Sequence, residues 1–424
     1  MGFKMLKNTV LFIVLIAISC ASKTKNDVAD IDVTTKQVQD NKNIIIGADR
    51  VGKYLPILKG KSIGIVANQT SMITVLQKNP VNASTMGSSK TTLHIVDYLH
   101  NYGFIDVKRI FSPEHGFRGK ADAGELVKDG KDSRTGLPIA SLHGKTKKPS
   151  AKLLKDIDVM VFDIQDVGVR FYTYISTLHY VMEACAESDI PLLILDRPNP
   201  NGSYVDGPVL EKKHSSFLGM HPIPLVHGMT IGEYAQMIND ENWLKDGIKC
   251  DVTIIPIKNY NHQMTYSLPI RPSPNLPNDQ SIMLYPSLGL FEGTNINAGR
   301  GTEFQFQRYG APFLDKNYYS FSYTPVSNFG AKYPKHQNSV CYGVDLSNTN
   351  ADRSFSLKYI IDAYNNSTDK TKFFITSGFT SHAGTEKLQK QIESGLSESE
   401  IRESWKDEIN AYNMMRQKYL LYEL

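Results

Sequence analysis

The feature that most constrains the fold is a regular alternation of apolar runs and stretches of helical periodicity between residues 61 and 256. The apolar runs have the length of buried strands and occupy residues 62–67, 107–111, 158–163, 191–195 and 252–256. The helical stretches occupy residues 91–100, 150–155, 177–187 and a segment that opens at Thr230, where Glu233 completes a capping box. Because strands that alternate with helices pair in parallel, the sequence predicts an α/β fold, a Rossmann-like doubly wound parallel sheet.

A second, smaller domain is expected after residue 265, so that residues 44–265 form the first. From Arg271 to Pro277 the chain is rich in proline, and beyond it aromatic residues mix with short apolar runs such as residues 372–375, expected as a strand. A last helix is expected over residues 400–421, with an apolar stripe formed by Trp405, Ile409, Tyr412, Met415 and Tyr419. We therefore predict an α+β domain over residues 266–424 that packs on the first and completes a cleft.

Polar side chains follow four of the predicted strands at the point where each strand ends. In chain order they are Asn68, then Glu114 and His115, then Asp163, Gln165 and Asp166, then Asp196 and Asn199. The carboxyl ends of parallel strands meet at one edge of the sheet, where ligands of such folds bind. Ordinary surface charges would be scattered along helices and loops as well. The pattern therefore predicts one shared cleft for a polar ligand at this edge.

The stretch Ser-Pro-Glu-His-Gly-Phe-Arg-Gly at residues 112–119 is the main candidate for the site. Pro113 cannot donate to a sheet ladder, so the preceding strand ends there. An acid, a titratable ring and a cation then follow as Glu114, His115 and Arg118. The alternative is a surface turn with ordinary charges. Since catalytic residues concentrate on loops at strand ends, we expect chemistry on a polar substrate.

Cofactors, metals and nucleic acid are not expected. A dinucleotide site needs Gly-x-Gly-x-x-Gly after the first strand, whereas residues 67–72 read Ala-Asn-Gln-Thr-Ser-Met, and the sequence has no Gly-x-x-x-x-Gly-Lys-Ser/Thr loop. The spacing of cysteine and histidine matches no zinc pattern. The net charge is +4 and the basic residues are spread along the chain, which argues against nucleic acid as a partner.

The amino-terminal residues are typical of a bacterial lipoprotein signal. Lys4 and Lys7 precede an apolar run over residues 10–18, about half of the ~20 residues that a membrane-spanning helix needs. Small residues then lead to Cys20. We therefore expect a signal peptide over residues 1–19, a lipid on Cys20, and a periplasmic or cell-surface protein attached to a bacterial membrane. The alternative is a plain signal peptide followed by an incidental cysteine.

Residues 20–43 are polar and poor in aromatic side chains. Such a segment buries too little apolar surface to fold by itself. It is expected to be a tether between the lipid and the first domain.

Six motifs occur in order along the chain. They are residues 112–119, Phe162–Tyr174, Asp196–Pro200, His227–Glu233, Pro272–Pro277, and Phe291–Thr294 together with Gly299–Thr302. Together they resemble the exo-β-N-acetylmuramidase family, glycoside hydrolase family 171, from about Gly47 to the carboxyl end. The resemblance implies release of terminal N-acetylmuramic acid from the non-reducing end of peptidoglycan fragments, in a cleft between a Rossmann-like domain and a smaller one. It also implies Glu114 as the catalytic acid and muropeptides or disaccharides derived from peptidoglycan as partners.

Two stretches depart from the family pattern. Residues 141–144 read Ser-Leu-His-Gly, with His143 where the family has tyrosine, and residues 303–308 read Glu-Phe-Gln-Phe-Gln-Arg, which is less typical after Gly-Arg-Gly-Thr. These departures bear on substrate preference more than on the reaction.

Glycoside hydrolysis needs a protonated acid at the leaving oxygen and a second group that stabilises or attacks the anomeric carbon. Glu114 fits the first role if partial burial against Phe111 and Phe117 raises its pKa. Asp163 and Asp166 are candidates for the second role, with Asp166 preferred because it lies past the strand end. The alternative is the 2-acetamido group of the substrate, oriented by an aspartate.

Other residues of these motifs are candidates for binding the sugar. An arginine suits the lactyl carboxylate of muramic acid, because a guanidinium binds a carboxylate with two hydrogen bonds. The arginine candidates are Arg118, Arg170 and Arg300, each with a structural ion pair as the alternative. Tyr172 and Tyr174 would stack on a sugar face or pack in the core. The remaining candidates are His115, Asn68, Gln165, Asn199, His227 and Glu292, of which Glu292 has the second carboxylate as its minor alternative.

Two other functions compete with a muramidase. One is an amidase or esterase that acts on cell-wall material, but the sequence has no Gly-x-Ser-x-Gly elbow and no metal-ligand spacing. The other is a non-catalytic, lipid-tethered sugar-binding protein.

We predict that Cys20→Ser releases the protein from the membrane and leaves the domains folded, because serine cannot carry the thioether-linked lipid. Membrane fractionation and fatty-acid labelling of both forms measure this. A wild-type protein that takes up no fatty acid would contradict the prediction.

Overall fold

The computed structural model describes residues 44–78, 88–119, 129–350 and 353–424. The predicted signal peptide, the lipidation site Cys20 and the tether lie outside the described residues. Within the described ranges, no helix is both long and apolar enough to cross a membrane.

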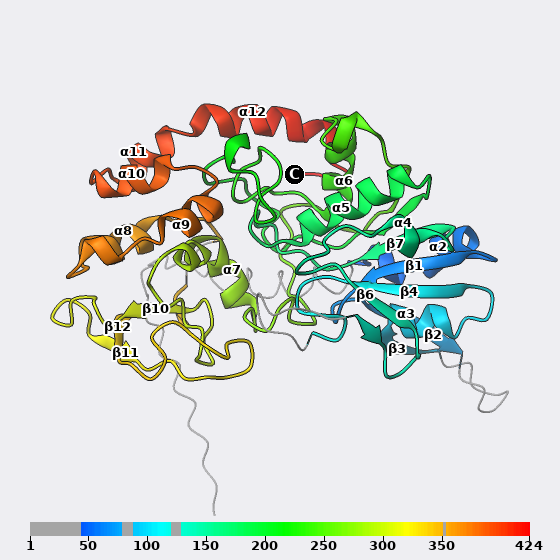
Figure 1. Ribbon diagram of the computed structural model, residues 1–424, viewed down its shortest axis with the longest axis horizontal. Coiled ribbons are helices and arrows are strands. Elements are labelled where there is room, and N and C mark those ends of the chain that lie inside the picture. Colours follow the sequence, from blue (N-terminus) through cyan, green and yellow to red (C-terminus); the bar gives the residue numbers. More distant parts are fainter. Residues whose placement is uncertain (1–43, 79–87, 120–128, 351–352) are drawn as a thin grey trace, which may run out of the picture.

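A seven-stranded sheet of order β5-β6-β4-β1-β7-β8-β9 forms the centre of the first domain (Figure 1). Neighbouring strands are parallel except β5 and β6, which are antiparallel. In this order the strands span Gly130–Lys131, Pro138–Ser141, Asp106–Ser112, Ser62–Ala67, Val159–Asp163, Leu192–Leu195 and Val252–Ile255. The five predicted strands and the mostly parallel sheet are confirmed.

Helices cover both faces of this sheet, because the central strands send alternate side chains into two separate cores. In β7, Val161 joins the core that includes α2 and α3, and Phe162 joins the core that includes α5 and α6. The helices are α2 Val51–Leu58, α3 Ile95–His100, α4 Ala151–Leu154, α5 Tyr174–Glu187 and α6 Ile231–Asp240. At the start of α6, Thr230 and Glu233 form both hydrogen bonds of the predicted capping box. The doubly wound arrangement is therefore confirmed.

The helix predicted over residues 91–100 is wrong in its first part. Strand β3 (Ser88–His94) pairs antiparallel with β2 (Met72–Lys78), and α3 begins only at Ile95. Thr91 and Thr92 are β-branched and favour a strand. His94 ends the strand as an N-cap, since its Nδ1 accepts a hydrogen bond from the backbone N–H of Val96.

The later part of the chain forms a second domain around a three-stranded antiparallel sheet of order β10-β12-β11. Its strands span Arg308–Ala311, Cys341–Asp345 and Phe321–Tyr323, and its helices are α7 Asp279–Leu288, α8 Lys358–Asn365, α9 Thr376–Ala383, α10 Lys387–Glu393, α11 Glu398–Glu403 and α12 Lys406–Arg416. Short 3₁₀ helices are η1 Gly47–Asp49, η2 Lys212–His214, η3 Lys245–Gly247, η4 Gly289–Gly293, η5 Lys370–Lys372 and η6 Gln417–Tyr419. A separate α+β domain is confirmed, whereas its boundary at residues 265 and 266 stays a prediction.

Two expectations for this domain are wrong. Residues 372–375 form no strand: η5 ends at Lys372, α9 begins at Thr376, and Phe374 makes one isolated antiparallel bridge with Thr294. Phe373 packs against Tyr364, and Phe374 packs against Phe379. The long helix expected over residues 400–421 is interrupted between α11 and α12 and ends in η6. Its stripe still faces the core, with Trp405, Tyr412 and Tyr419 all buried.

The carboxyl end of the chain returns to the first domain. α12 runs across the top of the molecule and the chain ends near α6 (Figure 1). Tyr422 Oη donates to Asp196 Oδ2 at 2.6 Å, directly after β8. The backbone N–H of Ile257 donates to the same tyrosine oxygen at 2.9 Å. The backbone N–H of Leu421 donates to Glu233 of α6 at 2.9 Å, so the last residues fasten the sheet edge to α6.

We predict that Tyr422→Phe destabilises the protein more above pH 6 than below it. Burial raises the pKa of Asp196 to about 6, against the lowering effect of its hydrogen bonds from Tyr422 and Gly232, so the carboxyl is ionised above that pH. A hydrogen bond to a charged acceptor contributes about 1.5–3 kcal/mol, and one between neutral groups about 0.5–1.5 kcal/mol. Urea titrations on both sides of pH 6 should show these two losses in the free energy of unfolding.

The sign of the underlying pH dependence follows from the same shift. Because the folded-state pKa of Asp196 is raised, its contribution to stability is complete below the unfolded value of about 3.9 and is lost as the pH rises through about 6. Tyr333→Phe, at a side chain that is 91% exposed, is the matched control. Equal losses for Tyr422→Phe at both pH values would contradict the assignment.

Candidate active site

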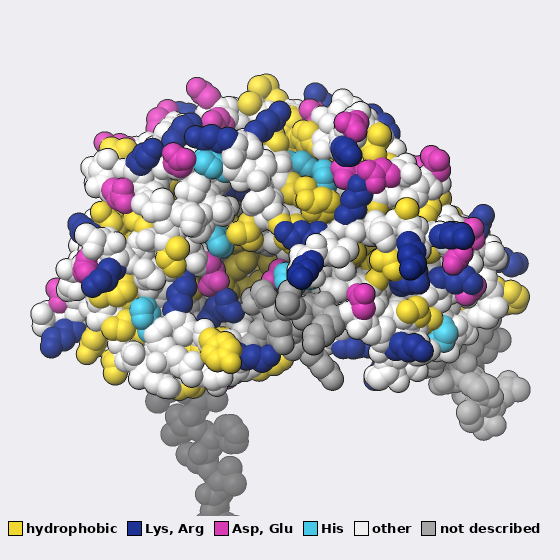
Figure 2. Space-filling view, in the orientation of Figure 1, with side chains coloured by type: hydrophobic (Ala, Val, Ile, Leu, Met, Phe, Trp, Pro, Cys, Tyr) yellow, Lys and Arg dark blue, Asp and Glu magenta, His cyan; other side chains and the backbone are white. Residues whose placement is uncertain are grey.

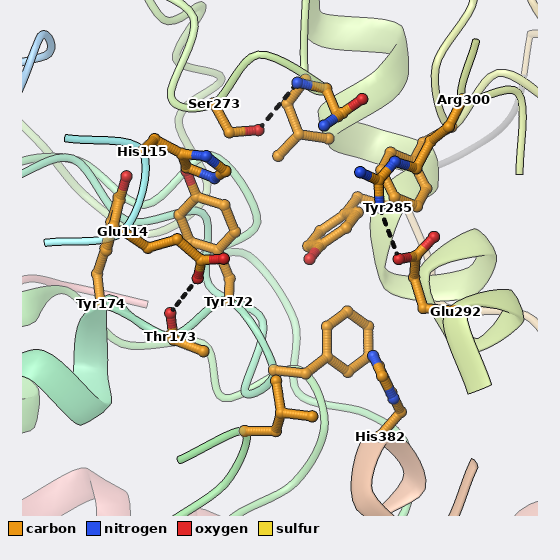
Figure 3. A pocket seen from close by; sticks show the side chains of 15 residues that line it. Glu114, His115, Tyr172, Thr173, Tyr174, Ser273, Tyr285, Glu292, Arg300 and His382 are labelled. Atoms are coloured by element: carbon orange, nitrogen blue, oxygen red, sulfur yellow. Dashed lines mark hydrogen bonds and ion pairs between the residues drawn. The ribbon is translucent and has the colours of Figure 1, made fainter. Parts of the chain in front are cut away.

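A pocket opens between the carboxyl edge of the sheet and the second domain, and hydrophobic side chains line the hollow on the face shown in Figure 2. Its space, including the open mouth, is about 640 Å³. The lining residues are Glu114, His115, Phe171, Tyr172, Thr173, Tyr174, Leu218, Ser273, Asn275, Leu276, Tyr285, Glu292, Arg300, Phe306 and His382. Figure 3 shows Glu114 and Glu292 on opposite walls, so the two domains each supply one carboxyl group.

The first wall carries Glu114, which follows β4 at the point where Pro113 ends the strand. Its Oε2 accepts a hydrogen bond of 3.0 Å from Thr173 Oγ1, at the residue before α5 (Figure 3). His115 beside it is buried and has a φ of 69°. A non-glycine residue holds this conformation only where its surroundings determine it, as they often do at functional sites.

The second wall carries Glu292 of η4 and Arg300. Arg300 Nη1 donates to Glu292 Oε2 at 2.9 Å (Figure 3), and its Nη2 donates to the carbonyl oxygen of Gly330 at 3.2 Å. Gly299 and Gly301 have φ values of 76° and 81°, which glycine adopts without strain. This turn places the guanidinium in the pocket beside Glu292.

The groups of the second wall differ in charge at neutral pH. Burial by itself would raise the pKa of Glu292, but the charges of Arg300 and Lys335 hold it below its ordinary value. Burial lowers the pKa of His382 and raises that of Tyr285 well above its ordinary value. The wall therefore presents an ionised carboxylate beside a neutral imidazole and a protonated phenol.

Aromatic rings join the two walls. Phe171 lies 5.3 Å from Tyr285 and 5.4 Å from His382 between ring centroids. Tyr172 lies 4.8 Å from Tyr174 and 5.9 Å from Tyr285. Such rings bind the apolar face of a sugar and leave its hydroxyls to polar groups. Acidic groups on opposite walls over an aromatic surface are the parts that glycoside hydrolysis needs.

Comparison with known proteins agrees with this chemistry. Residues 63–280 match the family model described as exo-beta-N-acetylmuramidase NamZ, N-terminal, and residues 283–422 match its C-terminal counterpart. The peptidoglycan beta-N-acetylmuramidase NamZ of Bacillus subtilis (strain 168) is 39% identical over 390 residues, covering 87% of this chain and 89% of that protein. The chain belongs to the exo-beta-N-acetylmuramidase NamZ family.

Solved structures of the same kind share the fold. One crystal structure of a DUF1343 family protein from Bacteroides fragilis is 46% identical with a TM-score of 0.78, covering 90% of this chain and 99% of that chain. A second DUF1343 family protein from Bacteroides fragilis is 26% identical with a TM-score of 0.72, at the same coverage of 90% and 99%. Membership of the NamZ family confirms the resemblance found in the motifs and makes the chain a glycoside hydrolase.

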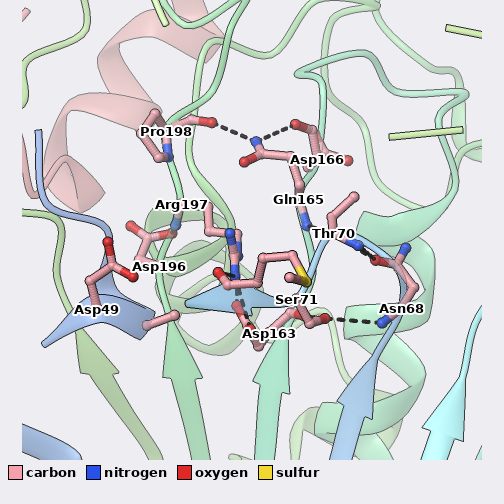
Figure 4. A network of polar contacts seen from close by, with 12 residues as sticks. Asp49, Asn68, Thr70, Ser71, Asp163, Gln165, Asp166, Asp196, Arg197 and Pro198 are labelled. Carbon is pink, nitrogen blue, oxygen red and sulfur yellow. Dashed lines mark hydrogen bonds and ion pairs between the residues drawn. The ribbon is translucent and has the colours of Figure 1, made fainter. Parts of the chain in front are cut away.

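Six of the predicted site residues line the pocket: Glu114, His115, Tyr172, Tyr174, Glu292 and Arg300. Other strand-end residues are not in the described lining and form a polar network at the carboxyl ends of the strands (Figure 4). In this network Arg197 donates to both oxygens of Asp163, at 2.6 and 2.9 Å, and both side chains are buried. Gln165 Nε2 donates to the carbonyl oxygens of Asp166 and Pro198, which ties two strand ends together.

The remaining network residues also have structural partners. Asp166 Oδ2 accepts from the backbone N–H of Gly168 at 2.6 Å and lies 3.5 Å from His227 Nε2. Asn68 Nδ2 donates to Tyr174 Oη, and Asn199 Nδ2 donates to the carbonyl oxygen of Met229. Asp163 and Asp166 are absent from the described pocket lining, so their predicted catalytic roles stay predictions and their contacts favour structural ones.

Two of the three candidate arginines have other partners. Arg118 is paired with Asp132 and Asp97. Arg170 is completely buried, and its guanidinium donates to four backbone carbonyl oxygens. Arg300 is thus the one candidate among the three that belongs to the described lining.

Sequence reasoning missed several lining residues. Thr173, Ser273 and Asn275 lie inside motifs that had been recognised, and only their roles were overlooked. Tyr285 and His382 come from α7 and α9, where no pattern in the sequence distinguishes them from core residues. No three or more His, Cys, Asp or Glu side chains of the described part of the chain are grouped so that they could hold a metal ion.

We predict that Asp163→Asn lowers the free energy of unfolding by about 3–5 kcal/mol, because it leaves the buried Arg197 without its charge partner. Urea titration measures the loss, and kcat/KM of the folded fraction measures activity. Asp166→Asn, in the neighbouring turn, should cost less stability. If Asp163→Asn retained its stability and lost turnover, Asp163 would return to the catalytic machinery.

Proposed function

We propose that the protein is an exo-acting β-N-acetylmuramidase that releases N-acetylmuramic acid from the non-reducing end of peptidoglycan fragments. Support comes from its family, from the Bacillus subtilis relative and from the six motifs. The observation that carries the proposal is the pair of carboxyl groups on opposite walls of one pocket, Glu114 and Glu292.

In this proposal Glu114 is the general acid at the glycosidic oxygen. Thr173 Oγ1 donates to one carboxyl oxygen and so fixes the orientation of the group. Thr173 itself is held at the start of α5, where its carbonyl accepts from the backbone of Thr177. A proton held on Glu114 then passes to the leaving oxygen as its bond to the anomeric carbon breaks, and a water molecule supplies the new oxygen at the anomeric carbon.

Substrate contacts follow from the lining. Tyr172 and Tyr285 bring aromatic rings to the pocket lining, and both keep their phenolic protons because burial raises each pKa. Arg300 is the candidate for the lactyl carboxylate of muramic acid, since its guanidinium reaches the pocket. His115 is the candidate for a polar contact next to Glu114.

The location of the enzyme is proposed from the sequence alone. A lipid on Cys20 and the tether over residues 20–43 would hold it at a bacterial membrane, on the periplasmic or outer side. The substrate would then be peptidoglycan material near that membrane.

We predict that Glu114→Gln lowers turnover about 10²–10⁴-fold, the usual contribution of general acid catalysis. The amide keeps the shape and cannot give up a proton. The variant should lose less activity on an aryl glycoside of β-N-acetylmuramic acid than on a disaccharide of N-acetylmuramic acid and N-acetylglucosamine. The reason is that the aryl leaving group needs less protonation. Parallel kinetics on the two substrates measure the difference.

Glu408→Gln, at an exposed glutamate of α12, is the control. A lowered melting temperature with equal losses on both substrates would make Glu114 structural. If the wild-type protein released no N-acetylmuramic acid from either substrate, the proposed function itself would fail.

A further inference from the structure

We propose that Glu292 is the second catalytic group of the pocket and that Lys335 is the positioning residue that holds it. The assignment rests on the proposed function. In that function Glu114 protonates the leaving oxygen, and here Glu292 acts at the anomeric carbon. Glu114 and Glu292 are the two carboxyl side chains among the described lining residues.

The ammonium group of Lys335 binds the backbone that carries Glu292. Its Nζ donates to the carbonyl oxygens of Phe291, Glu292 and Thr294 at 2.9, 3.1 and 2.5 Å. A lysine has three ammonium protons, so these bonds use its full donor capacity. The carbonyls lie at the carboxyl end of η4, where the helix dipole favours a cation. The Phe291 oxygen also accepts from the backbone N–H of Thr294. Lys335 therefore fixes the position of Glu292 in the wall.

The same segment holds Arg300. Asn297 Nδ2 donates to the carbonyl oxygens of Arg300 and Lys335, at 3.0 and 2.9 Å. Arg300 in turn donates to the carboxylate of Glu292 at 2.9 Å. Lys335 thus holds the backbone of Glu292, and Arg300 holds its side chain. Asn297 links the backbones of Arg300 and Lys335.

The charged and titratable groups around Glu292 favour its ionised form. Arg300 and Lys335 are the neighbouring cations, and both act against the burial that would raise the pKa of Glu292. Burial lowers the pKa of His382, so this ring is neutral near pH 7, and it raises the pKa of Tyr285, which keeps its proton. Glu292 therefore stays a carboxylate near pH 7.

The aspartates of the polar network do not offer the same chemistry. Asp163 binds Arg197 with both oxygens, and Asp166 accepts from the backbone of Gly168. Glu292 instead belongs to the described pocket lining, on the wall opposite Glu114 (Figure 3). Positive charge develops at the anomeric carbon in the transition state, and a carboxylate held in place stabilises it without reorganising.

The first test is Glu292→Gln, assayed on the aryl glycoside and on the disaccharide. Loss of one preorganised stabilising group lowers kcat about 10²–10³-fold. Both substrates should lose equally, because Glu292 acts at the anomeric carbon, which they share. Glu114→Gln acts at the leaving group and should spare the aryl substrate. Wild-type turnover retained by a folded Glu292→Gln variant would overturn the assignment.

The second test is the pH profile of kcat/KM in Lys335→Met. Loss of this cation should raise the pKa of Glu292, so the acid limb of the profile should move to higher pH. Lys335→Arg keeps a cation and should restore part of the shift, and Lys316→Met, at an exposed lysine of the same domain, should leave the profile unchanged. A role confined to stability would lower the melting temperature and leave the acid limb in place, which would overturn the positioning role.

The two proposals fail in distinguishable ways. Wild-type protein that releases no N-acetylmuramic acid contradicts the proposed function. Wild-type protein that does so, with a Glu292→Gln variant of equal activity, contradicts the role of Glu292 alone.

Discussion

The pocket depends on one buried cation, Arg170. Its guanidinium donates at 2.7–3.0 Å to the carbonyl oxygens of Pro208, Ile223, His382 and Ala383. The first two belong to the sheet domain and the last two to α9 of the second domain. Residues 171–174, which follow Arg170 directly, line one side of the pocket, and His382 lines the other. Since a buried donor without a partner costs about 1–3 kcal/mol, these bonds strongly favour one relative position of the two walls.

The sequence predicted the sheet and the place of Glu114 for the same physical reason. A buried parallel strand is apolar on both faces, so its run of side chains and its end are visible without any partner. The sequence does not show whether a polar residue at that end is structural or part of a site, because its partners come from the ends of other strands. Asp163 shows this limit: Arg197 from the next strand neutralises it inside the network, 34 residues away in the chain.

The second wall could be predicted only in part. Glu292 and Arg300 both lie in recognised motifs. Their ion pair depends on the turn at Gly299 and Gly301, and no periodicity of the sequence predicts that turn. Lys335 gave no signal at all, since a lysine in an irregular loop is usually solvated. Its three bonds to the end of η4 arise because the loop folds back over that helix, a contact between segments 41–44 residues apart.

The two stretches that depart from the family pattern differ in their relation to the pocket. Four residues of the pocket lining lie in motifs that resemble those of the family: Glu114, Thr173, Glu292 and Arg300. Phe306 lies in the departing stretch 303–308, yet its ring lines the pocket 4.8 Å from that of Tyr285. His143, in the other departure, is not among the described lining residues. A change at residues 303–308 therefore alters the pocket surface beside Tyr285 and leaves Glu114 and Glu292 in place. If this pocket binds the sugar as proposed, substrate preference can vary while the reaction stays the same.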